Sequence, residues 1–245
     1  MQPVSLEKTQ QRIGSMFDRI AATYDFLNHF LSAGLDLWWR RKAVRALALP
    51  PGSVILDVAT GTGDLALAAL QAQGDAHVVG LDLAFNMLQI AQAKRDRKGW
   101  SASRYPLLQG DALELPFPAE TFHAVMIAYG IRNVPHMGAA LKEFHRVLRP
   151  GGLLLVLEFT LPSSALLKRL YLFYFEKILP RLGGAVSRDP EAYAYLPASV
   201  GAFVTPEELS ARAGDAGFHS SRVQRLTGGI TYFLTAVKNG GQRTR

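Results

Sequence analysis

The chain has 245 residues, 49% of them hydrophobic, and its 27 Lys and Arg against 20 Asp and Glu give a net charge of +7. This length and composition predict one larger α/β domain with a full apolar core and exclude a disordered chain. The lack of cysteine excludes a disulfide framework, a thiolate metal site and a cysteine nucleophile. The positive charge is typical of proteins that bind nucleic acid or an anionic membrane, and a soluble enzyme with a basic surface also fits it.

The amino-terminal region is predicted to form a helical cap over residues 1–50. Its first 19 residues are polar and mixed in charge, unlike a signal or transit peptide, and no apolar run in the chain reaches the length of a membrane span. We therefore expect a cytoplasmic protein. Amphipathic patterns predict helices over residues 16–28 and 35–49, separated by Ser32-Ala33-Gly34.

Apolar runs and helical patterns alternate along the domain predicted over residues 51–238. Alternation of this kind predicts a doubly wound, mostly parallel seven-stranded α/β sheet of the Rossmann-like type, which binds ligands at the carboxyl ends of its strands. The strands are expected at 54–58, 78–83, 106–109, 124–128 and 153–159, the helices at 65–73, 85–98 and 136–148, and a turn at Arg149-Pro150-Gly151-Gly152.

The carboxyl-terminal part departs from this alternation. A helical insertion is expected within residues 160–200, with a helix over 165–182 that Pro180 or Gly183-Gly184 ends. Thr205-Pro206-Glu207-Glu208 has the pattern of a capping box at a helix start. Strands over 221–226 and 230–237 are predicted to form an antiparallel hairpin, followed by a frayed tail at 239–245.

The first predicted strand ends in a glycine turn, and the second ends in an acid. Gly61 and Gly63 let the backbone approach a ligand closely, and the helix that follows presents free N–H groups to an anion. Asp82, at the tip of the second strand, is placed to accept hydrogen bonds from both hydroxyls of a ribose. The pattern predicts a site for an adenine nucleoside that carries a negative group at its far end.

The residues around this turn favour one cofactor. The glycine pattern alone also fits a nicotinamide or flavin dinucleotide, or an ordinary βα turn. Asp57 lies inside the first strand, where a carboxylate is awkward beside a pyrophosphate but attracts an ammonium group. S-adenosylmethionine (SAM) carries both an amino group and a carboxylate, and an acid after the third strand can accept from its adenine. The predicted SAM contacts are Asp57, Gly61, Thr62, Gly63, Asp82, Asp111 and Ala112.

The methyl acceptor is not expected to be nucleic acid. Methylation at C5 of a pyrimidine normally needs a cysteine, which the chain lacks. Amino methylation of a base usually needs an Asn/Asp-Pro-Pro-aromatic loop after the fourth strand. Residues 128–133 read Ala-Tyr-Gly-Ile-Arg-Asn at that place. The six histidines show no ligand spacing, so no metal site is predicted.

Several stretches besides the glycine turn have distinctive sequences. They are residues 17–28, 31–34 and Trp38-Trp39-Arg40, then 115–118, 129–133, 146–152 and Glu158-Phe159. Together they resemble the signatures of the ubiquinone/menaquinone biosynthesis C-methyltransferases, from about residue 12 to residue 230. The chain departs from that family at Asp36, where histidine is usual, and at Ala128 and Thr160, where serine is usual.

The resemblance implies a class I SAM-dependent methyltransferase that acts on a polyprenylated quinol. It implies Thr62, Asp82, Asp111 and Ala112 as cofactor contacts. Likeness around residues 59–63 favours demethylmenaquinol as the acceptor, with a 2-polyprenyl-6-methoxy-1,4-benzoquinol of ubiquinone synthesis as the alternative. A SAM-binding subunit without catalysis is the alternative from another class.

Two further expectations concern the acceptor. A quinol carbon becomes nucleophilic when a ring hydroxyl ionises, which costs ~4 kcal/mol at pH 7 for a phenol of pKa about 10, and a nearby cation reduces this cost. Arg132 is the candidate partner of the acceptor oxyanion. The alternative is that Arg132 forms a structural ion pair. The helix over 165–182 either packs on the core or, with the cap, forms a lipid-tail groove on an anionic membrane. Its apolar face comprises Leu166, Leu167, Leu170, Tyr171, Tyr174, Ile178 and Leu182.

Overall fold

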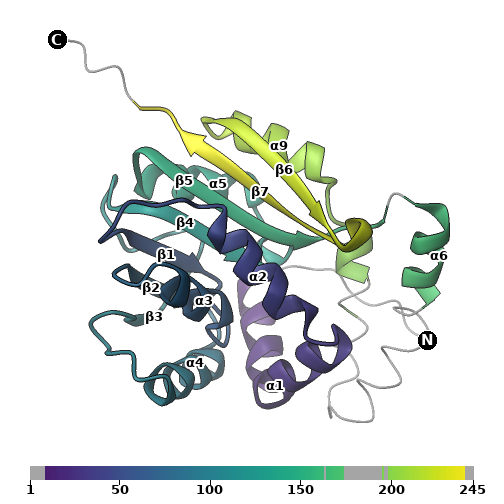
Figure 1. Ribbon diagram of the computed structural model, residues 1–245, viewed down its shortest axis with the longest axis horizontal. Coiled ribbons are helices and arrows are strands. Elements are labelled where there is room, and N and C mark those ends of the chain that lie inside the picture. Colours follow the sequence, from purple (N-terminus) through teal and green to yellow (C-terminus); the bar gives the residue numbers. More distant parts are fainter. Residues whose placement is uncertain (1–8, 163, 174–194, 196–197, 241–245) are drawn as a thin grey trace.

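The computed structural model describes residues 9–162, 164–173, 195 and 198–240. Within them, seven strands form one sheet in the order β3-β2-β1-β4-β5-β7-β6 (Figure 1). Strands β1 to β5 run parallel, and β7 pairs antiparallel with both β5 and β6. The predicted doubly wound, mostly parallel sheet with a carboxyl-terminal hairpin is confirmed. The strands are β1 (Val54–Val58), β2 (His77–Asp82), β3 (Leu107–Gln109), β4 (Phe122–Ala128), β5 (Leu148–Phe159), β6 (Phe218–Leu226) and β7 (Thr231–Lys238).

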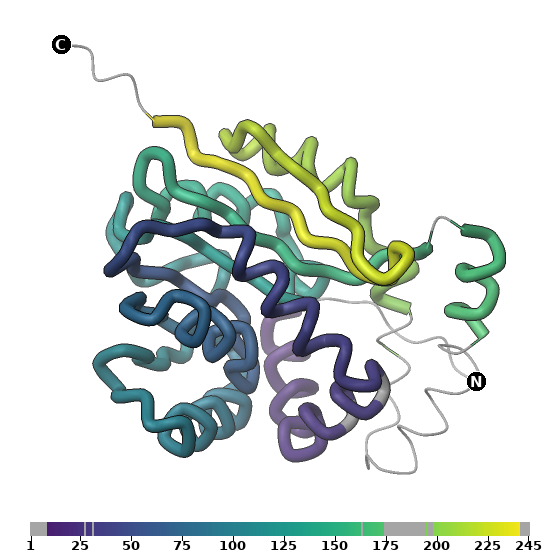
Figure 2. The backbone as a smooth tube through the Cα atoms, viewed as in Figure 1, coloured from purple at the N-terminus to yellow at the C-terminus, as the bar shows by residue number. Residues whose placement is uncertain are grey.

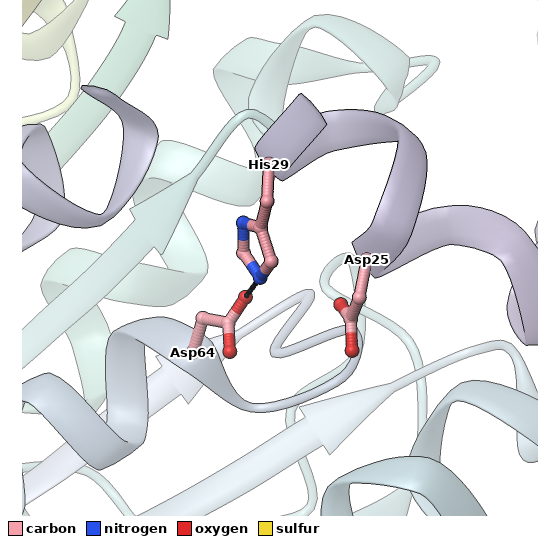
Figure 3. Close-up of side chains that lie close together, drawn as sticks. All are labelled: Asp25, His29 and Asp64. Atoms are coloured by element: carbon pink, nitrogen blue, oxygen red, sulfur yellow. Dashed lines mark ion pairs between the residues drawn. The ribbon is translucent and has the colours of Figure 1, made fainter. Parts of the chain in front are cut away.

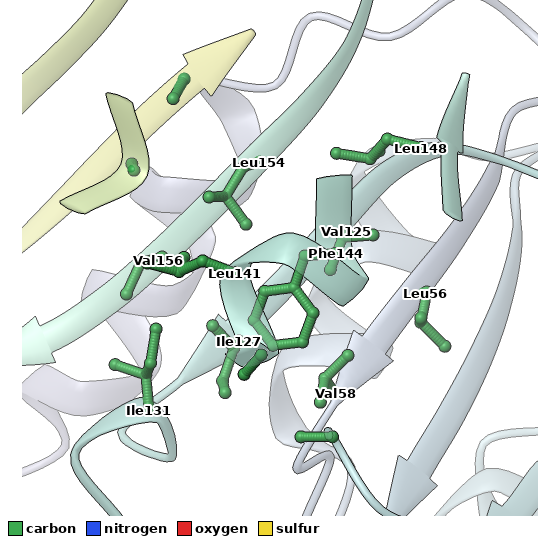
Figure 4. Packing of buried hydrophobic residues seen from close by; sticks show 14 of the residues in the cluster. Leu56, Val58, Val125, Ile127, Ile131, Leu141, Phe144, Leu148, Leu154 and Val156 are labelled. Carbon is green, nitrogen blue, oxygen red and sulfur yellow. The ribbon is translucent and has the colours of Figure 1, made fainter. Parts of the chain in front are cut away.

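The core forms because successive strand residues point to opposite faces of the sheet. Leu56 and Val58 face α5 (Met137–Val147) and α9 (Pro206–Asp215), where Phe144 lies at the centre of a buried cluster (Figure 4). Ile55, which precedes Leu56 in the chain, faces the helices α2 (Leu35–Arg45) and α3 (Asp64–Ala72). Helices therefore cover both faces, which is why the strands read as continuous apolar runs.

Helix α1 (Gln10–Leu31) lies at the carboxyl edge of the sheet. Ile13, Met16 and Ile20 pack against Ala84 and Met87, at the start of α4 (Phe85–Arg97). Figure 2 shows α1 in purple beside the blue-teal segment of α4. The helix is longer than the predicted 16–28, because Thr9 caps its amino terminus by accepting the Arg12 N–H.

The turn predicted at residues 149–152 is wrong. Strand β5 starts at Leu148, directly after α5, and runs through the Pro-Gly-Gly segment to Phe159. Leu148 pairs with Phe122 and Leu153 pairs with Ala124, so the segment bulges out between two paired positions. Gly151 takes up the bend with φ +77°. The Pro-Gly-Gly sequence does bend the chain, but the residues on both sides of the bend pair with β4, so the bend is a bulge within β5.

The carboxyl-terminal elements agree with the sequence. Thr205 and Glu208 form the expected capping box, and the hairpin strands are joined by a short 3-10 turn, η3 (Thr227–Gly229). Helix α6 (Ala165–Phe173) is the described part of the helix predicted over 165–182. The predictions for Tyr174, Ile178, Pro180, Leu182 and Gly183-Gly184, like those within residues 1–8 and 241–245, concern positions outside the described residues.

No helix among the described residues is both long and apolar enough to cross a membrane.

Candidate functional site

A first cavity, here called the glycine-turn cavity, lies where the carboxyl ends of β1, β2 and β4 meet α1. Its volume, part of which is open to solvent, is about 730 Å³. Gly61, Asp82 and Ala112 form part of its wall, and Gln10 and Phe17 of α1 cover it. Ligands of doubly wound sheets bind at this edge, so three of the predicted cofactor residues line the expected place.

The turn after β1 needs its glycines. Gly61 has φ +56° and Gly63 has φ +88°, in the left-handed region that favours glycine. A Cβ on Gly63 would lie 2.8 Å from the Tyr105 hydroxyl and 3.2 Å from the Ala91 Cβ. Gly63 therefore allows α3 to start close to α4, although it does not line the cavity among the described residues.

Asp82 is fixed at the cavity wall by backbone hydrogen bonds. Its Oδ2 accepts the Gly61 N–H at 2.7 Å, and its Oδ1 accepts the Ala84 N–H at 2.8 Å. Burial raises the pKa of this carboxyl to about 6, although the two N–H donors oppose the shift. The glycine turn and the carboxylate thus hold each other in place at the tip of β2.

Asp57 is buried in β1, next to the glycine turn. Its Oδ2 accepts a hydrogen bond from the Thr60 hydroxyl at 2.6 Å, and its Oδ1 has no partner within the described chain. Burial raises the pKa of Asp57 to about 7. An unpaired buried carboxylate oxygen is costly unless a cation approaches it. Asp57 is not in the described wall of the glycine-turn cavity.

Two predicted contacts are turned toward neighbouring side chains. The Thr62 hydroxyl donates to Asp25 of α1 at 2.5 Å and accepts from Lys94 of α4 at 3.1 Å. Asp111 accepts the Leu113 N–H at 2.9 Å and a hydrogen bond from the Gln10 amide. Neither residue is in the described wall of the glycine-turn cavity. Thr62 and Asp111 therefore both hold α1 in place through hydrogen bonds. Gln10, the partner of Asp111, lies in the wall of the glycine-turn cavity.

A second cavity, here called the arginine cavity, adjoins the first and has a volume of about 670 Å³, part of which is open to solvent. Phe17, Tyr24 and Tyr129 line both cavities, so the two spaces meet at these aromatic rings. The sequence analysis missed this cavity, although a signal was present. Polar side chains recur every four residues where α1 leads into α2, and all of them line the cavity: Tyr24, Asn28, Ser32, Asp36 and Arg40.

Arg132 lines the arginine cavity and is also half of a buried ion pair. Its Nη1 lies 2.6 Å from Glu158 Oε1 and donates to the Tyr129 carbonyl at 2.7 Å. Glu158 is fully buried, and burial raises its pKa while Arg132 opposes the shift. At 2.6 Å the pair is charged, because each partner compensates the desolvation of the other.

Arg40 is a second buried cation in this wall, which the sequence analysis did not select. Its guanidinium lies over the Tyr129 ring, 5.0 Å from the centroid, and its Nε is 3.9 Å from Asp36 Oδ2. The Nε atom has no hydrogen-bond partner within the described chain. An unpaired buried donor in a cavity wall is suited to an anionic or polar oxygen of a ligand.

Asp25, His29 and Asp64 form a polar cluster behind these cavities (Figure 3). Lys94 Nζ lies 2.6 Å from a carboxylate oxygen of Asp25 and 2.6 Å from one of Asp64. The cluster therefore already contains a cation, and it connects α1, α3 and α4 as a charge network.

Comparison with known proteins gives matches over nearly the whole chain. The model of the ubiE/COQ5 methyltransferase family matches residues 5–238. A protein of Syntrophotalea carbinolica named ubiquinone/menaquinone biosynthesis C-methyltransferase UbiE is 50% identical over 91% of this chain and 93% of its own length. A protein of Thermus thermophilus named demethylmenaquinone methyltransferase is 48% identical over 88% of this chain and 96% of its own length.

A solved structure from Thermotoga maritima, described as a SAM-dependent methyltransferase and possible histamine N-methyltransferase, superposes with a TM-score of 0.64. The match covers 92% of this chain and 99% of that chain at 21% identity. At this identity the likeness shows a shared fold.

Proposed function

The chain belongs to the ubiE/COQ5 methyltransferase family, and from this premise we propose that it methylates a ring carbon of demethylmenaquinol with SAM as the methyl donor. The family match confirms the resemblance drawn from the sequence signatures. One relative is named for menaquinone synthesis alone and another for both quinones. The benzoquinol of ubiquinone synthesis is therefore the competing acceptor.

The observation that carries this proposal is the junction of the two cavities. The glycine-turn cavity suits SAM, with Asp82 in its wall for the ribose. Asp57 lies behind the glycine turn and outside the described wall, and its unpaired Oδ1 is proposed to attract the amino group. The arginine cavity is lined by aromatic rings and two buried arginines, which suits a flat ring bearing acidic hydroxyls. SAM, when bound, supplies a methyl group on a positively charged sulfur. Rings shared by both cavities then align donor and acceptor, a proximity effect.

Arg132 is proposed to hold one oxygen of the acceptor. A guanidinium stays protonated at any workable pH, so Arg132 stabilises developing negative charge and does not act as a base. Glu158 fixes the Nη1 side of the guanidinium, and the Phe159 ring lies 5.7 Å from its central carbon. The pairing restricts Arg132 to one orientation in the cavity wall, where it needs no reorganisation when the acceptor ionises.

We expect labelled SAM to transfer its methyl group to a short-chain demethylmenaquinol in the presence of the protein. The rate should exceed that with the matching 2-prenyl-6-methoxybenzoquinol, because the resemblance around residues 59–63 favours the naphthoquinol. Equal incorporation without enzyme and with enzyme, for both acceptors, would leave the SAM-binding subunit as the function. A higher kcat/KM for the benzoquinol would assign the protein to the ubiquinone branch.

The acceptor's prenyl tail and the exposed apolar residues together support contact with an anionic membrane. Phe26 and Phe30 of α1 stack on each other and are 59% and 60% exposed. Leu35 and Trp38 of α2 are also exposed, and Lys42 lies over the Trp38 ring. These four apolar residues, here called the corner patch, lie on the two helices that line the arginine cavity. Their basic neighbours suit an anionic lipid surface.

The side chains of helix α6 divide between the two roles predicted for this helix, packing on the core and contact with lipid. Tyr171 is buried, and Leu167 packs against the turn at Gly228. Leu166, Leu170 and Phe173 are exposed, at 71%, 58% and 58%. The predicted single apolar face is therefore divided between core packing and solvent. The exposed half is proposed as a second lipid contact, next to Lys168 and Arg169 in sequence.

The protein should co-sediment with phosphatidylglycerol vesicles at low salt and be released at high salt, since exposed charges are screened. Lys42→Glu should weaken this binding because it reverses a charge at the corner patch. Arg222→Glu on β6 makes the same charge change at another exposed position and should have a smaller effect. Binding that is absent at both salt concentrations, or equally reduced by the two variants, would remove the corner patch as the membrane contact.

A further inference from the structure

Methyl transfer to a quinol carbon produces one proton that must leave the site. The new C–C bond forms as the S–CH₃ bond breaks, the electron pair of that bond stays on sulfur, and the positive charge of the sulfonium is lost. The acceptor exchanges a ring hydrogen for the methyl group, so charge balance requires one proton to be released in each turnover. Helix α1 lines one side of the arginine cavity, and a side chain in the cavity wall that takes up this proton would assist the reaction. This need for a proton acceptor rests on the proposed function.

The arginine cavity contains one carboxylate among the described residues that line it, Asp36. The arginines of this wall cannot take a proton. Burial raises the pKa values of the three tyrosines of this wall, Tyr24, Tyr129 and Tyr195, so none of these phenols ionises readily to become a base. Asp36 is 4% exposed, and its Oδ1 accepts the Ser32 hydroxyl at 2.7 Å. It is therefore the group in this wall suited to take the hydroxyl proton of an acceptor.

His29 connects Asp36 to the outside of the fold. Its Nδ1 lies 2.9 Å from Asp36 Oδ2, and on the other side of the ring its Nε2 lies 3.5 Å from Asp64 Oδ2. Figure 3 shows the ring reaching from α1 to Asp64 at the start of α3. The His29 side chain is 31% exposed, whereas that of Asp36 is 5% exposed. His29 and Asp64 both line a third, open cavity with Lys94 and Arg97.

We propose that Asp36, His29 and Asp64 form a proton exit from the acceptor cavity. Asp36 takes the proton from the quinol hydroxyl and passes it to His29 Nδ1. The proton on Nε2 then leaves through the Asp64 side to water in the open cavity. The ring carbon attacks the methyl group, and the hydrogen that this carbon loses returns to the ring oxygen, which restores the quinol. The sum is the single proton released in each turnover.

The charges around His29 suit a relay. Asp36 of α2, Asp64 of α3 and Asp25 of α1 place carboxylates near the ring, and Arg40 and Lys94 are the cations of the same network. Lys94 is paired with both Asp25 and Asp64, so Asp64 remains an anionic acceptor beside His29. An imidazole exchanges protons near neutral pH, which neither the arginines nor the lysine can do.

The test uses the full-length protein, SAM and a short-chain demethylmenaquinol. His29→Ala should lower kcat about 10- to 100-fold with little change in SAM affinity, and added imidazole should restore part of the rate, since it can enter the space left beside Asp36. Asp36→Asn should lower kcat about 100-fold at neutral pH, and the loss should shrink as rising pH ionises the quinol without help. His219→Gln on β6, an exposed histidine change, should leave kcat unchanged.

Other outcomes overturn the relay in distinct ways. A parent protein without methyl transfer to either quinol removes the proposed function and the relay with it. An active parent whose His29→Ala and Asp36→Asn variants keep kcat within twofold removes the relay alone. Loss of activity accompanied by a lower Tm and weaker SAM binding, without response to imidazole or pH, makes His29 a structural link between α1 and α2. If His29→Ala does not fold, His29→Gln and Asp36→Asn decide by the same pH profile.

Discussion

Replacing Arg132 by alanine is expected to destabilise the protein by about 3–5 kcal/mol, because it leaves a buried carboxylate without its partner. Glu158 is fully buried, and its Oε1 accepts from Arg132 at 2.6 Å and from the Phe159 N–H at 2.8 Å. Its other oxygen has no hydrogen-bond partner within the described chain. Urea unfolding of parent and variant measures the difference.

The stability lost in Arg132→Ala should depend on pH, and the titration of Glu158 determines the direction. Without Arg132, burial holds the folded-state pKa of Glu158 above its unfolded value of about 4.3. A raised folded-state pKa gives a contribution that is fully present below the unfolded pKa and is lost as pH rises through the folded value. The variant should therefore be closest to the parent at about pH 4, and its stability loss should grow as the pH rises toward about 8.

A matched pair of variants checks this cause. Adding Glu158→Gln to Arg132→Ala removes the stranded charge and should recover part of the stability at pH 8. Arg132→Lys keeps a positive charge near Glu158 but loses the planar fork. It should therefore be more stable to urea than Arg132→Ala, and it should transfer the methyl group more slowly than the parent. An Arg132→Ala protein whose stability loss is small and equal at all pH values would contradict the charged-pair account.

The sequence predicted those features that depend on local patterns. Residues 54–58 form β1 as expected, and the glycine turn and Asp82 meet because a parallel neighbour strand brings its carboxyl end to the same edge. The capping box at Thr205 is also local and was found. The bulge at 149–152 was misread because the pairing that retains it in β5 comes from a different strand.

The sequence did not predict the arginine cavity, although the polar side chains spaced four residues apart from Tyr24 to Arg40 are a partial local signal for it. The sequence places Arg132 after β4, as the structure has it. Its pairing with Glu158 can be predicted only when β5 is known to lie beside β4. The Thr62 side chain is expected at the cofactor, whereas its hydroxyl is hydrogen-bonded to Asp25 and Lys94, which approach from α1 and α4. For Arg132 the missing information is the pairing of β4 with β5, and for Thr62 it is the packing of α1 and α4 over the strand ends. Both are long-range arrangements.

Replacing Asp82 by alanine is expected to weaken SAM binding by ~2–4 kcal/mol, which is about 30- to 700-fold, because two charge-assisted hydrogen bonds to the ribose are lost. The carboxylate is held for this role by the Gly61 and Ala84 N–H groups, and it lines the glycine-turn cavity. Calorimetric titration of the folded variant with SAM measures the change.

Acidification should weaken the same interaction in the parent protein. Burial raises the pKa of Asp82 to about 6, so lowering the pH through that value protonates the carboxyl and removes an acceptor from the ribose site. SAM affinity should therefore fall from about pH 7.5 to about pH 5 in the parent. Asp57 protonates in the same direction, from a pKa of about 7. Asp82→Ala should retain only the part of this pH dependence that belongs to Asp57.

A control variant separates binding from folding. Asp75 also accepts a backbone N–H, from Gly52 at 2.8 Å, but it is exposed and lies before β2, at the opposite end of that strand from Asp82. Asp75→Ala therefore removes a comparable loop hydrogen bond and should leave SAM affinity unchanged. If Asp82→Ala binds SAM within twofold of the parent, Asp82 does not hold the ribose. If Asp75→Ala weakens binding as much, the loss arises from the loops, because only Asp82 lies in the cavity wall.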